Sequence, residues 1–408
     1  MTRVVVIGAG AAGTMAAIFA ATAGAETVLL ERTRDGGRKI LISGGGRCNV
    51  LPSELDETRF ITDSSPNTLR KLVRSWPLAQ QKEFFEQEVG IPLVEESESQ
   101  KMFPASHKAR DVRDGLLTLA RQRGVSVVFN TQVADVFQRA GGWTVTTTSG
   151  TSFDADAVIL ATGGLSVPMT GSDGIGLRLL ERLGHTMHPT YAALTPLVAA
   201  PAPFASLSGV SLTVTLTATS GTRSATATGG FLFTHIGYSG PSALDVSHVV
   251  VRSRLERDTP PARVAVRWTA LGDDEWVDRL KPRGSRTVFG ALRAELPDRL
   301  AAALIASANV AADRVLSELT RDERQRLVET LVRGALPWTS DEGYKKAEVT
   351  GGGLSLAEFD PRTMQSRRCP GLFVCGEVLD AFGPIGGYNF LWAWATGRAA
   401  GLGAAKAA

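Results

Sequence analysis

The start of the chain alternates between apolar runs and glycine-bounded turns. Val4-Val5-Val6-Ile7 is an unbroken β-branched run that ends at Gly8, a pattern typical of a strand buried on both faces of a parallel sheet. Small residues up to Gly24 predict a helix after a tight turn, and residues 26–31 predict a second strand. The order strand, turn, helix, strand is a βαβ unit, around which the rest of the chain is organised.

Later apolar runs predict how this sheet continues. We expect a strand over residues 124–130, then strands over 133–138 and 143–148, with glycine turns after each of these last two. Turns spaced so closely predict an antiparallel meander, which returns the chain to the parallel sheet at residues 157–160. By fold-level analogy, a meander in place of a crossover helix is typical of FAD-binding sheets. A last buried run at residues 372–375 predicts one further strand.

The middle of the chain has a different pattern of apolar and polar residues. Residues 210–217 and 263–268 alternate strictly between apolar and polar, which predicts half-exposed antiparallel strands. Residues 286–336 have helical spacing, with Ser317 or Thr320 as an N-cap. We therefore predict an α/β fold in which a Rossmann-like domain with a β-meander comprises residues 1–191 and 338–408. A substrate or cap domain, residues 192–337, is inserted, with 192–272 barrel-like and 273–337 helical.

The turn after the first strand reads Gly8-Ala9-Gly10-Ala11-Ala12-Gly13. Gly8 permits the turn, Gly10 lets backbone N–H groups approach a pyrophosphate, and Gly13 lets the helix pack on the sheet. The N-terminus of the helix then faces the phosphates with its partial positive charge. Glu31 ends the second strand, where an acid binds a ribose hydroxyl and repels a 2′-phosphate, so FAD or NAD is favoured over NADP.

A secretory signal peptide is the alternative explanation of this apolar start. The glycine spacing, Glu31 and the absence of a clean cleavage pattern argue against it. We therefore expect a cytoplasmic protein.

Composition excludes several classes of function. The net charge of +3 comes without any Lys/Arg-rich block, which argues against a nucleic-acid partner. Cys48, Cys369 and Cys375 form no CxxC pair and the five histidines have no ligand spacing, so neither a metal site nor a disulfide framework is expected. No apolar run approaches the roughly 20 residues that span a bilayer, so no membrane partner is expected. The oligomeric state stays open.

A glycine-dense segment follows the second strand, at residues 35–49. Its glycines leave the backbone free to wrap a ligand, and Arg38, Lys39 and Arg47 supply positive charge beside the expected pyrophosphate. The alternative is a flexible surface loop. Cys48 lies in the same segment, and we interpret it as a buried inert cysteine rather than a redox thiol.

Two features near the C-terminus point to a flavin. A buried strand ending in Gly376-Glu377 places a carboxylate where the ribitol of a flavin would pass. Gly386-Gly387-Tyr388-Asn389 starts a last helix, to about Gly401. If the N-terminus of this helix faces the pyrimidine edge of the flavin, its dipole stabilises negative charge on the reduced ring.

Together these motifs resemble the BaiN-like (HI0933-like) flavoproteins over nearly the whole chain. The resemblance is carried by GAGAAG with Glu31, GRKILISGGGRCN, FPASHKARDV, ATGG, FLFTHIGYSGP, TGGG, TMQS and GLFVCGEVLD followed by GGYNFLWAWATG. It implies an NAD(P)/FAD-dependent oxidoreductase, or for some members an aminoacetone oxidase, with noncovalent FAD and a barrel-plus-helix insert. The cofactor-binding residues that we predict are Gly8, Gly10, Ala11, Ala12, Gly13, Glu31, Arg32, Arg38, Lys39, Ser43, Gly44, Gly45, Gly46, Arg47, Cys48, Asn49, Val133, Ala161, Thr162, Gly163, Gly376, Glu377, Gly386, Gly387, Tyr388 and Asn389.

The chain departs from the family pattern after Asp380. Phe382 and Pro384 stand where small or polar groups are usual near the flavin ring, and residues 171–176 vary on a GDG-like theme. These departures leave the expected fold and cofactor intact, but they predict a substrate that differs from those of better-known members.

The expected chemistry is hydride transfer at flavin N5, as NAD(P)H-dependent reduction of an activated C=C or C=N bond in a small molecule. No second GxGxxG opens a helix after a strand, so a nicotinamide donor would visit the flavin transiently. His235, Tyr238 and Tyr388 are weak candidates for proton transfer, and each also has a packing or capping explanation. An amine oxidase that uses O2, a flavoprotein with non-redox FAD and an RNA-modifying enzyme are the alternatives.

Overall fold

The computed structural model describes residues 1–97 and 99–407. The chain divides into two compact units, one formed by Met1–Tyr191 and Glu348–Ala408 and the other by Ala192–Ala347. We call them the first unit and the insert. The insert ends at Ala347, not at residue 337, because β18 (Ser340–Asp341) pairs with β12 (Leu197–Val198) inside its sheet.

The first unit is built on a five-stranded parallel sheet of order β20-β10-β1-β2-β6. Strand β1 lies in the centre, and Val6 is aligned with Ile159 on one side and with Leu29 on the other. The predicted α/β class is therefore confirmed. The strands are β1 (Arg3–Ile7), β2 (Glu26–Leu30), β6 (Ser126–Val128), β10 (Ala157–Leu160) and β20 (Leu372–Val374).

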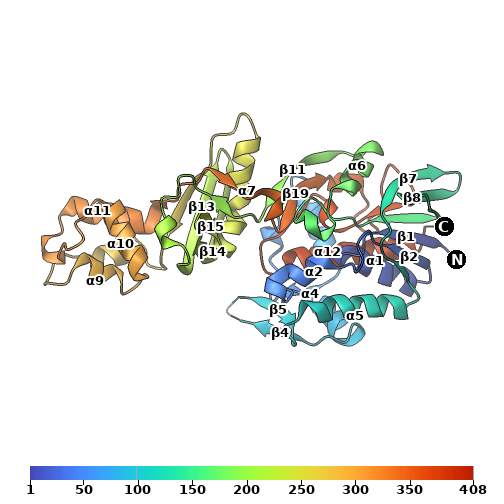
Figure 1. Cartoon of the computed structure of the whole chain (residues 1–408), viewed down its shortest axis with the longest axis horizontal. Coiled ribbons are helices and arrows are strands. Elements are labelled where there is room, and N and C mark those ends of the chain that lie inside the picture. The colour runs from blue at the N-terminus through green and yellow to red at the C-terminus, as the bar shows by residue number, and fades with distance from the viewer. Residues whose placement is uncertain (98, 408) are drawn as a thin grey trace. The chain divides into compact units, whose positions relative to one another are not determined.

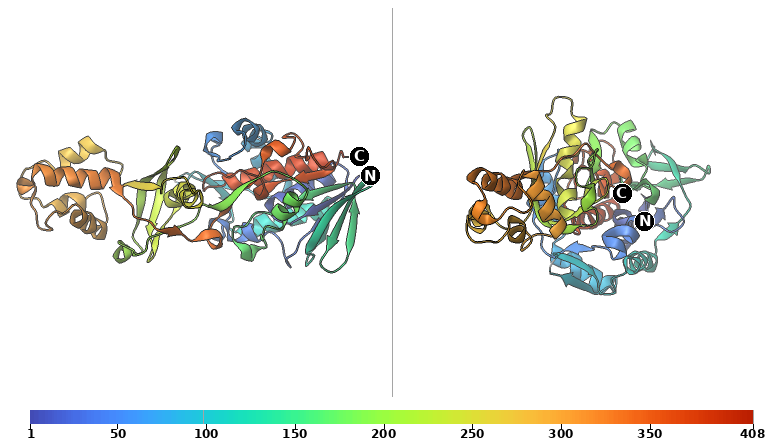
Figure 2. Two further views of the ribbon diagram at one scale, coloured as in Figure 1. Left: turned by 90° about the horizontal axis from the view of Figure 1, so that it is seen from above. Right: turned by 60° about the vertical axis from the view of Figure 1, so that its left-hand side comes forward.

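Helices from the two ends of the chain pack together in this unit. Helices α1 (Ala11–Thr22) and α12 (Tyr388–Ala404) lie side by side (Figures 1 and 2). A Cβ at Gly397 would lie 2.4 Å from Ala12 O, and one at Gly401 would lie 2.3 Å from Ala16 O. Glycines on α12 therefore allow the two helix backbones to approach closely, which brings the C-terminal helix against the first βαβ unit.

The predicted meander is a separate three-stranded antiparallel sheet. Its third strand, β9, occupies residues between the second turn and the return to β10. The strands are β7 (Val133–Arg139), β8 (Gly142–Thr147) and β9 (Ser152–Ala155). The other elements of the first unit are α2 (Arg38–Ile42), β3 (Leu51–Pro52), α3 (Pro66–Arg74), α4 (Leu78–Glu83), β4 (Leu93–Glu96), β5 (Lys101–Pro104), α5 (Ala109–Gln122), α6 (Ile175–Arg182), and the pair β11 (Met187–Ala193) with β19 (Val349–Leu354).

The insert combines a sheet with a helical part. Its seven strands follow the order β17-β16-β13-β14-β15-β12-β18, with β17 and β18 at the edges. This open order differs from the expected barrel, and helix α7 (Pro241–Leu255), which packs on β13 and β14, lies in the part expected to contain strands (Figure 1). The further elements are β13 (Ser211–Ser220), β14 (Arg223–Phe233), β15 (Gly237–Ser239), β16 (Arg263–Arg267), α8 (Asp273–Arg279), α9 (Val288–Leu292), α10 (Asp298–Ser307), α11 (Arg321–Arg333) and β17 (Gly334–Ala335).

Helix α11 begins at one of the two N-caps that the sequence suggests. Thr320 Oγ1 accepts a hydrogen bond from Glu323 N at 3.2 Å, and the Glu323 side chain accepts one from Thr320 N at 2.9 Å. This reciprocal capping box satisfies two N–H groups at the helix start and confirms Thr320 over Ser317. Within residues 1–97 and 99–407, the helices are too short or too polar to span a membrane.

Candidate cofactor site

The glycine turn after β1 has three different environments. Gly8 has a φ of +105°, and a Cβ there would lie 2.5 Å from Ala161 O. A Cβ at Gly13 would lie 1.8 Å from Gly8 O, so only glycine lets α1 pack against the turn. Gly10 differs, because its φ is −80° and a Cβ would meet no atom within 4 Å. The open space beside Gly10 is at the start of α1, where Ala11 and Ala12 follow and where the helix presents backbone N–H groups.

Glu31 lies at the carboxyl end of β2, close to this turn. One carboxylate oxygen accepts a hydrogen bond from Ala9 N at 2.8 Å. The other accepts from Thr33 N at 2.8 Å and from Thr33 Oγ1 at 2.7 Å. Thr131 N donates to Glu31 O at 2.8 Å, which brings the segment leading to Val133 beside it. These hydrogen bonds fix the orientation of the Glu31 carboxylate. The oxygen that accepts from Ala9 N can accept a further hydrogen bond.

Arg32 follows Glu31 and points to another segment. Its guanidinium forms an ion pair with Asp173 and donates to Gly171 O at 3.4 Å. Gly163 packs against the same segment, because a Cβ there would lie 2.8 Å from Ser172 Oγ. The GDG-like segment 171–176 thus lies against the carboxyl ends of β2 and β10, beside Thr162 and Gly163.

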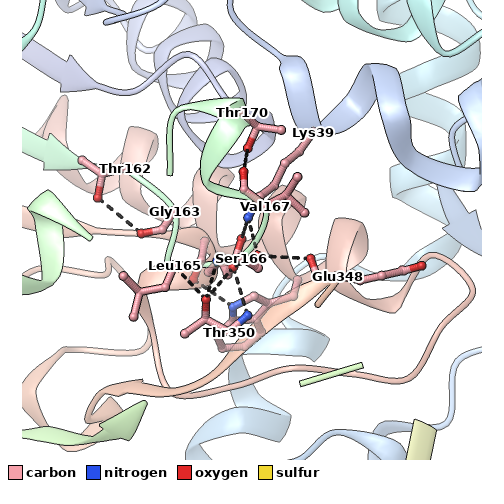
Figure 3. A network of polar contacts seen from close by, with 12 residues as sticks. Lys39, Thr162, Gly163, Leu165, Ser166, Val167, Thr170, Glu348 and Thr350 are labelled. Atoms are coloured by element: carbon pink, nitrogen blue, oxygen red, sulfur yellow. Dashed lines mark hydrogen bonds and ion pairs between the residues drawn. The ribbon is translucent and has the colours of Figure 1, made fainter. Parts of the chain in front are cut away.

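A partly buried polar network joins α2 to the ends of β10 and β20. Lys39 Nζ lies 2.5 Å from Glu377 Oε2 and 2.6 Å from Ser166 Oγ. Glu377 Oε1 accepts from Ser166 Oγ at 2.6 Å, and from Thr350 N and Oγ1 at 3.0 and 2.9 Å. Figure 3 shows Lys39 and Thr350 approaching Ser166 from two sides. Burial acts to raise the pKa of Glu377, but the Lys39 ammonium and these hydrogen bonds outweigh it and lower the pKa below its ordinary value.

The glycine-dense segment is more ordered than the sequence suggests. It contains helix α2 and a short 3-10 turn, Ser43–Gly46, in which Gly44 and Gly45 adopt left-handed conformations. A Cβ at Gly44 would lie 2.6 Å from Asn49 Oδ1. This amide oxygen is buried and accepts no hydrogen bond from the described part of the chain. The segment therefore ends on an acceptor that is suited to a ligand N–H or O–H.

Each of the three cations in this segment has a carboxylate partner. Arg38 Nε lies 2.9 Å from Asp35 Oδ1, Lys39 pairs with Glu377, and Arg47 lies 2.9 Å from Glu96 Oε1. Arg47 also stacks over the Phe103 ring at 4.1 Å. Their place beside a pyrophosphate stays a prediction, and the positive charge that they offer is smaller than their number suggests.

Cys48 is fully buried within this segment. Burial raises the pKa of its thiol to about 12, although a hydrogen bond with Ser43 acts in the opposite direction. Because the thiolate is the reactive form, we expect Cys48 to resist alkylation by iodoacetamide at pH 8 in the folded protein. Mass spectrometry before and after denaturation measures this, with Cys369 and Cys375, which are also buried, as internal references. Rapid native labelling of Cys48 alone would contradict the expectation.

The start of α12 is fixed by contacts within the first unit. Gly386 and Gly387 have φ values of +117° and +97°, and a Cβ at Gly387 would lie 2.4 Å from Leu51 C. The Asn389 side chain closes the preceding turn by pairing with both Gly383 N and Gly383 O at 2.9 Å. Helix α12 has no side-chain cap, so its first N–H groups are available to a ligand.

The three candidates for proton transfer have dissimilar environments. Tyr388 is buried, and its hydroxyl donates to Glu54 O and accepts from Asp56 N, both at 3.3 Å. Tyr238 is buried in the aromatic core of the insert, where burial raises the pKa of its phenol. His235 is exposed on the turn between β14 and β15. Hydrogen bonds satisfy the Tyr388 hydroxyl, whereas the buried Tyr238 hydroxyl has no hydrogen-bond partner among the described residues. The role of each of the three residues in proton transfer stays a prediction.

One polar cluster in the first unit is not predicted by the sequence. Asp380, 2% exposed, accepts through Oδ2 from Asp63 N at 2.9 Å, Ser64 N at 2.7 Å, Ser64 Oγ at 2.8 Å and Thr62 Oγ1 at 2.9 Å. His188 Nε2 lies 3.6 Å from the same oxygen. Thr62 and Asp380 are 318 positions apart, so no local pattern links them.

Phe382 and Pro384, which depart from the family pattern, are buried and do not project into open space. Phe382 is 2% exposed, and its backbone pairs with Ile61. Its ring meets Tyr191 edge-on at 6.3 Å. The backbone at Phe382 is therefore held by the segment that Asp380 also binds.

The chain matches the family model of the HI0933-like protein Rossmann domain over residues 2–403. It is 30% identical over 422 residues to the 3-dehydro-bile acid delta(4,6)-reductase of Clostridium scindens, with 100% of both chains covered. It is also 30% identical over 399 residues to a ribosomal RNA dihydrouridine synthase of Escherichia coli, which covers 96% of this chain and 95% of that protein.

Among solved structures, the chain is similar to the 3-ketosteroid delta1-dehydrogenase from Sterolibacterium denitrificans in complex with 1,4-androstadiene-3,17-dione. The identity is 13%, the coverage is 99% of this chain and 100% of that one, and the TM-score is 0.56. At this identity the likeness concerns the fold.

Proposed function

The chain belongs to the HI0933-like family of FAD-dependent oxidoreductases, and we propose that it reduces a C=C bond conjugated to a carbonyl group in a small molecule, with NAD(P)H as electron donor. The full-length similarity to the 3-dehydro-bile acid delta(4,6)-reductase carries this proposal. The name of the second relative, a dihydrouridine synthase, also describes saturation of a C=C bond next to a carbonyl. Both names thus favour reduction of an activated alkene over oxidation of an amine.

The residues at the carboxyl ends of the parallel strands have the chemistry that binds a dinucleotide such as FAD. The open space beside Gly10 is a cradle that a Cβ would fill, and it lies at the N-terminus of α1, where a pyrophosphate is favoured. Asn49 Oδ1 is a buried acceptor that still needs a donor, as a flavin N–H would provide. We therefore assign noncovalent FAD to the edge formed by the ends of β1, β2, β10 and β20.

FAD, when bound, supplies the hydride at N5. Glu31 would orient a ribose through its carboxylate, and Glu377, held by Lys39, Ser166 and Thr350, would accept from the ribitol. The N–H groups at the start of α12 would favour negative charge on the adjacent ring edge. Reduction of the alkene consumes one hydride and one proton.

The test is anaerobic reduction of the FAD-loaded protein. We expect NADH or NADPH to bleach the yellow flavin, and a 3-oxo-4-ene steroid, as a model conjugated enone, to restore the colour while its double bond is consumed. Flavin absorbance and mass spectrometry of the steroid measure the two half-reactions. A flavin that neither nicotinamide bleaches would contradict the proposal.

Two further experiments distinguish the proposed reductase from an amine oxidase and from an RNA-modifying enzyme. If aminoacetone bleaches the flavin and only O2 restores its colour, the protein is an amine oxidase and not a reductase. Recovery of the colour by uridine-containing RNA but not by the enone would replace the small molecule with a nucleic acid.

A further inference from the structure

The side chain of Lys101 lies beside the start of α12. A Cβ at Gly386 would lie 3.4 Å from Lys101 Cε and 3.5 Å from Lys101 Cγ, so the aliphatic stem of the lysine runs along this glycine. The pairing of β3 with β5 fixes the arrangement, because Pro52 is aligned with Lys101 and a Cβ at Gly387 would lie 2.7 Å from Pro52 N. The ammonium is therefore one bond beyond the lysine carbon that lies nearest to the helix start.

The Lys101 ammonium has no hydrogen bond or ion pair within the part of the chain that the structure describes. Glu96 is aligned with Lys101 in the pairing of β4 with β5. Its carboxylate is held instead by Arg47, at 2.9 Å, and by Ser99 Oγ, at 2.6 Å. Lys101 is only partly exposed, so it has lost some of its water without gaining a carboxylate partner, and its three donors are available to a ligand.

Two sources of positive charge meet at this place. Helix α12 has 17 residues and no side-chain cap, and its aligned peptide dipoles give its N-terminus a partial positive charge. A cation is disfavoured beside such a helix end unless an anion is also present, yet the strand pairing holds Lys101 there. The ligand with the matching charge is therefore a group that is negative or that becomes negative during the reaction.

A hydrogen-bond acceptor accompanies these two positive groups. Asn49 Oδ1 is buried without a partner among the described residues, and Asn49 lies two residues before β3, whose backbone packs against Gly387. The pyrimidine edge of a flavin carries one N–H, at N3, next to the carbonyl oxygen O2. A phosphate group has no such donor and would leave Asn49 Oδ1 unsatisfied. An acceptor beside two positive groups therefore matches the flavin edge better than it matches a phosphate.

From these observations we propose that Lys101 faces the cofactor, stabilises the negative charge of the reduced flavin at N1 and O2, and so raises the reduction potential of the flavin. The inference rests on the proposed function, since it takes FAD as the cofactor. When N5 accepts a hydride, the electron pair enters the ring and the negative charge is carried by N1 and O2. The oxidised ring has no such charge, so Lys101 contributes little to the binding of oxidised FAD.

Sulfite probes this charge without catalytic turnover. The sulfur lone pair forms a bond to flavin N5, and the resulting adduct carries its negative charge at N1 and O2. The FAD-loaded wild type, Lys101→Met, Lys101→Arg and Lys71→Met are titrated with sulfite by the loss of flavin absorbance. Their reduction potentials are measured by equilibration with a reference dye. Lys71→Met is the control for net charge, because Lys71 is exposed on α3 of the same unit.

We expect Lys101→Met to weaken sulfite binding by roughly tenfold, as the loss of one partly screened charge would. The same factor lowers the potential of a two-electron couple by about 30 mV. Lys101→Arg, which keeps the charge, and Lys71→Met should both match the wild type. The affinity for oxidised FAD should be the same in all four proteins.

Wild-type sulfite affinity and potential in Lys101→Met would overturn the proposal. A loss of oxidised FAD affinity without a change in potential would also overturn it, because Lys101 would then be a structural residue. If Lys101→Met does not fold, Lys101→Gln, which keeps a polar side chain along Gly386, is measured in the same way. A wild type that binds no FAD would instead refute the proposed function. Bound FAD that no nicotinamide bleaches would refute the proposed electron donor and leave the sulfite comparison valid.

Discussion

Replacement of Asp380 by alanine should destabilise the first unit by about 2–4 kcal/mol, because each buried or partly buried donor left without its acceptor costs roughly 1–3 kcal/mol. Asp63 N and Ser64 N both donate to the lost oxygen, and Ser64 Oγ also loses it. The segment around Ile61 should then loosen from Phe382, to which it is paired. The urea midpoint followed by tryptophan fluorescence measures the loss.

A matched variant separates the hydrogen bonds from the ion pair. His188 approaches the same oxygen at 3.6 Å and is 26% exposed, so His188→Ala should cost no more than about 1 kcal/mol. Asp380→Asn should lie between the two, because the amide keeps one acceptor oxygen. A midpoint for Asp380→Ala equal to that of His188→Ala would show that the cluster contributes little to stability.

Local patterns predicted the elements that carry the βαβ unit. An apolar run bounded by glycine identifies β1. Gly8 and Gly13 are each required for a different reason, because a side chain at either position would clash with a different backbone atom. Thr320 and Glu323 form the capping box that their spacing allows. In each case, residues within a few positions of one another determine the geometry, so sequence alone suffices.

Contacts between distant segments were not predictable in the same way. Lys39 lies in a glycine-dense segment, and no residue of that segment indicates that its side chain pairs with a carboxylate 338 positions away. Asp380 likewise binds a segment near the other end of the chain. A charged residue in a motif identifies a candidate site, but only the fold selects the partner of its charge.

Helix α7 was missed for a physical reason. Its residues are largely buried on more than one side, including Val246, Val249 and Val250, so it lacks the one-sided apolar stripe that reveals a helix. β-branched residues in such a run favour a strand interpretation. Packing against β13 and β14 outweighs that local preference.

The largest functional effect is expected from Gly10→Ala. The backbone at Gly10, with φ −80° and ψ −169°, accepts alanine without strain, and the added Cβ meets no protein atom. If the pyrophosphate occupies that space, the methyl group pushes it away from the N–H groups of α1. Loss of about two charge-assisted hydrogen bonds would weaken FAD binding by roughly 10²- to 10⁴-fold.

Gly272→Ala is the control for this change. Gly272 also precedes a helix, α8, with φ −92° and ψ −169°, but it lies in the insert. Both substitutions replace a glycine N-cap by alanine, so both should lower stability by a similar small amount, below about 1 kcal/mol. Equal thermal midpoints of the two apoproteins would establish that any difference in FAD binding arises from the ligand site.

Titration of these two apoproteins and the wild type with FAD, in parallel, tests most directly whether the cofactor lies across the glycine turn. The wild type and Gly272→Ala should bind with equal affinity, while Gly10→Ala should remain largely colourless after gel filtration. Undiminished FAD binding by Gly10→Ala would contradict the location of the site.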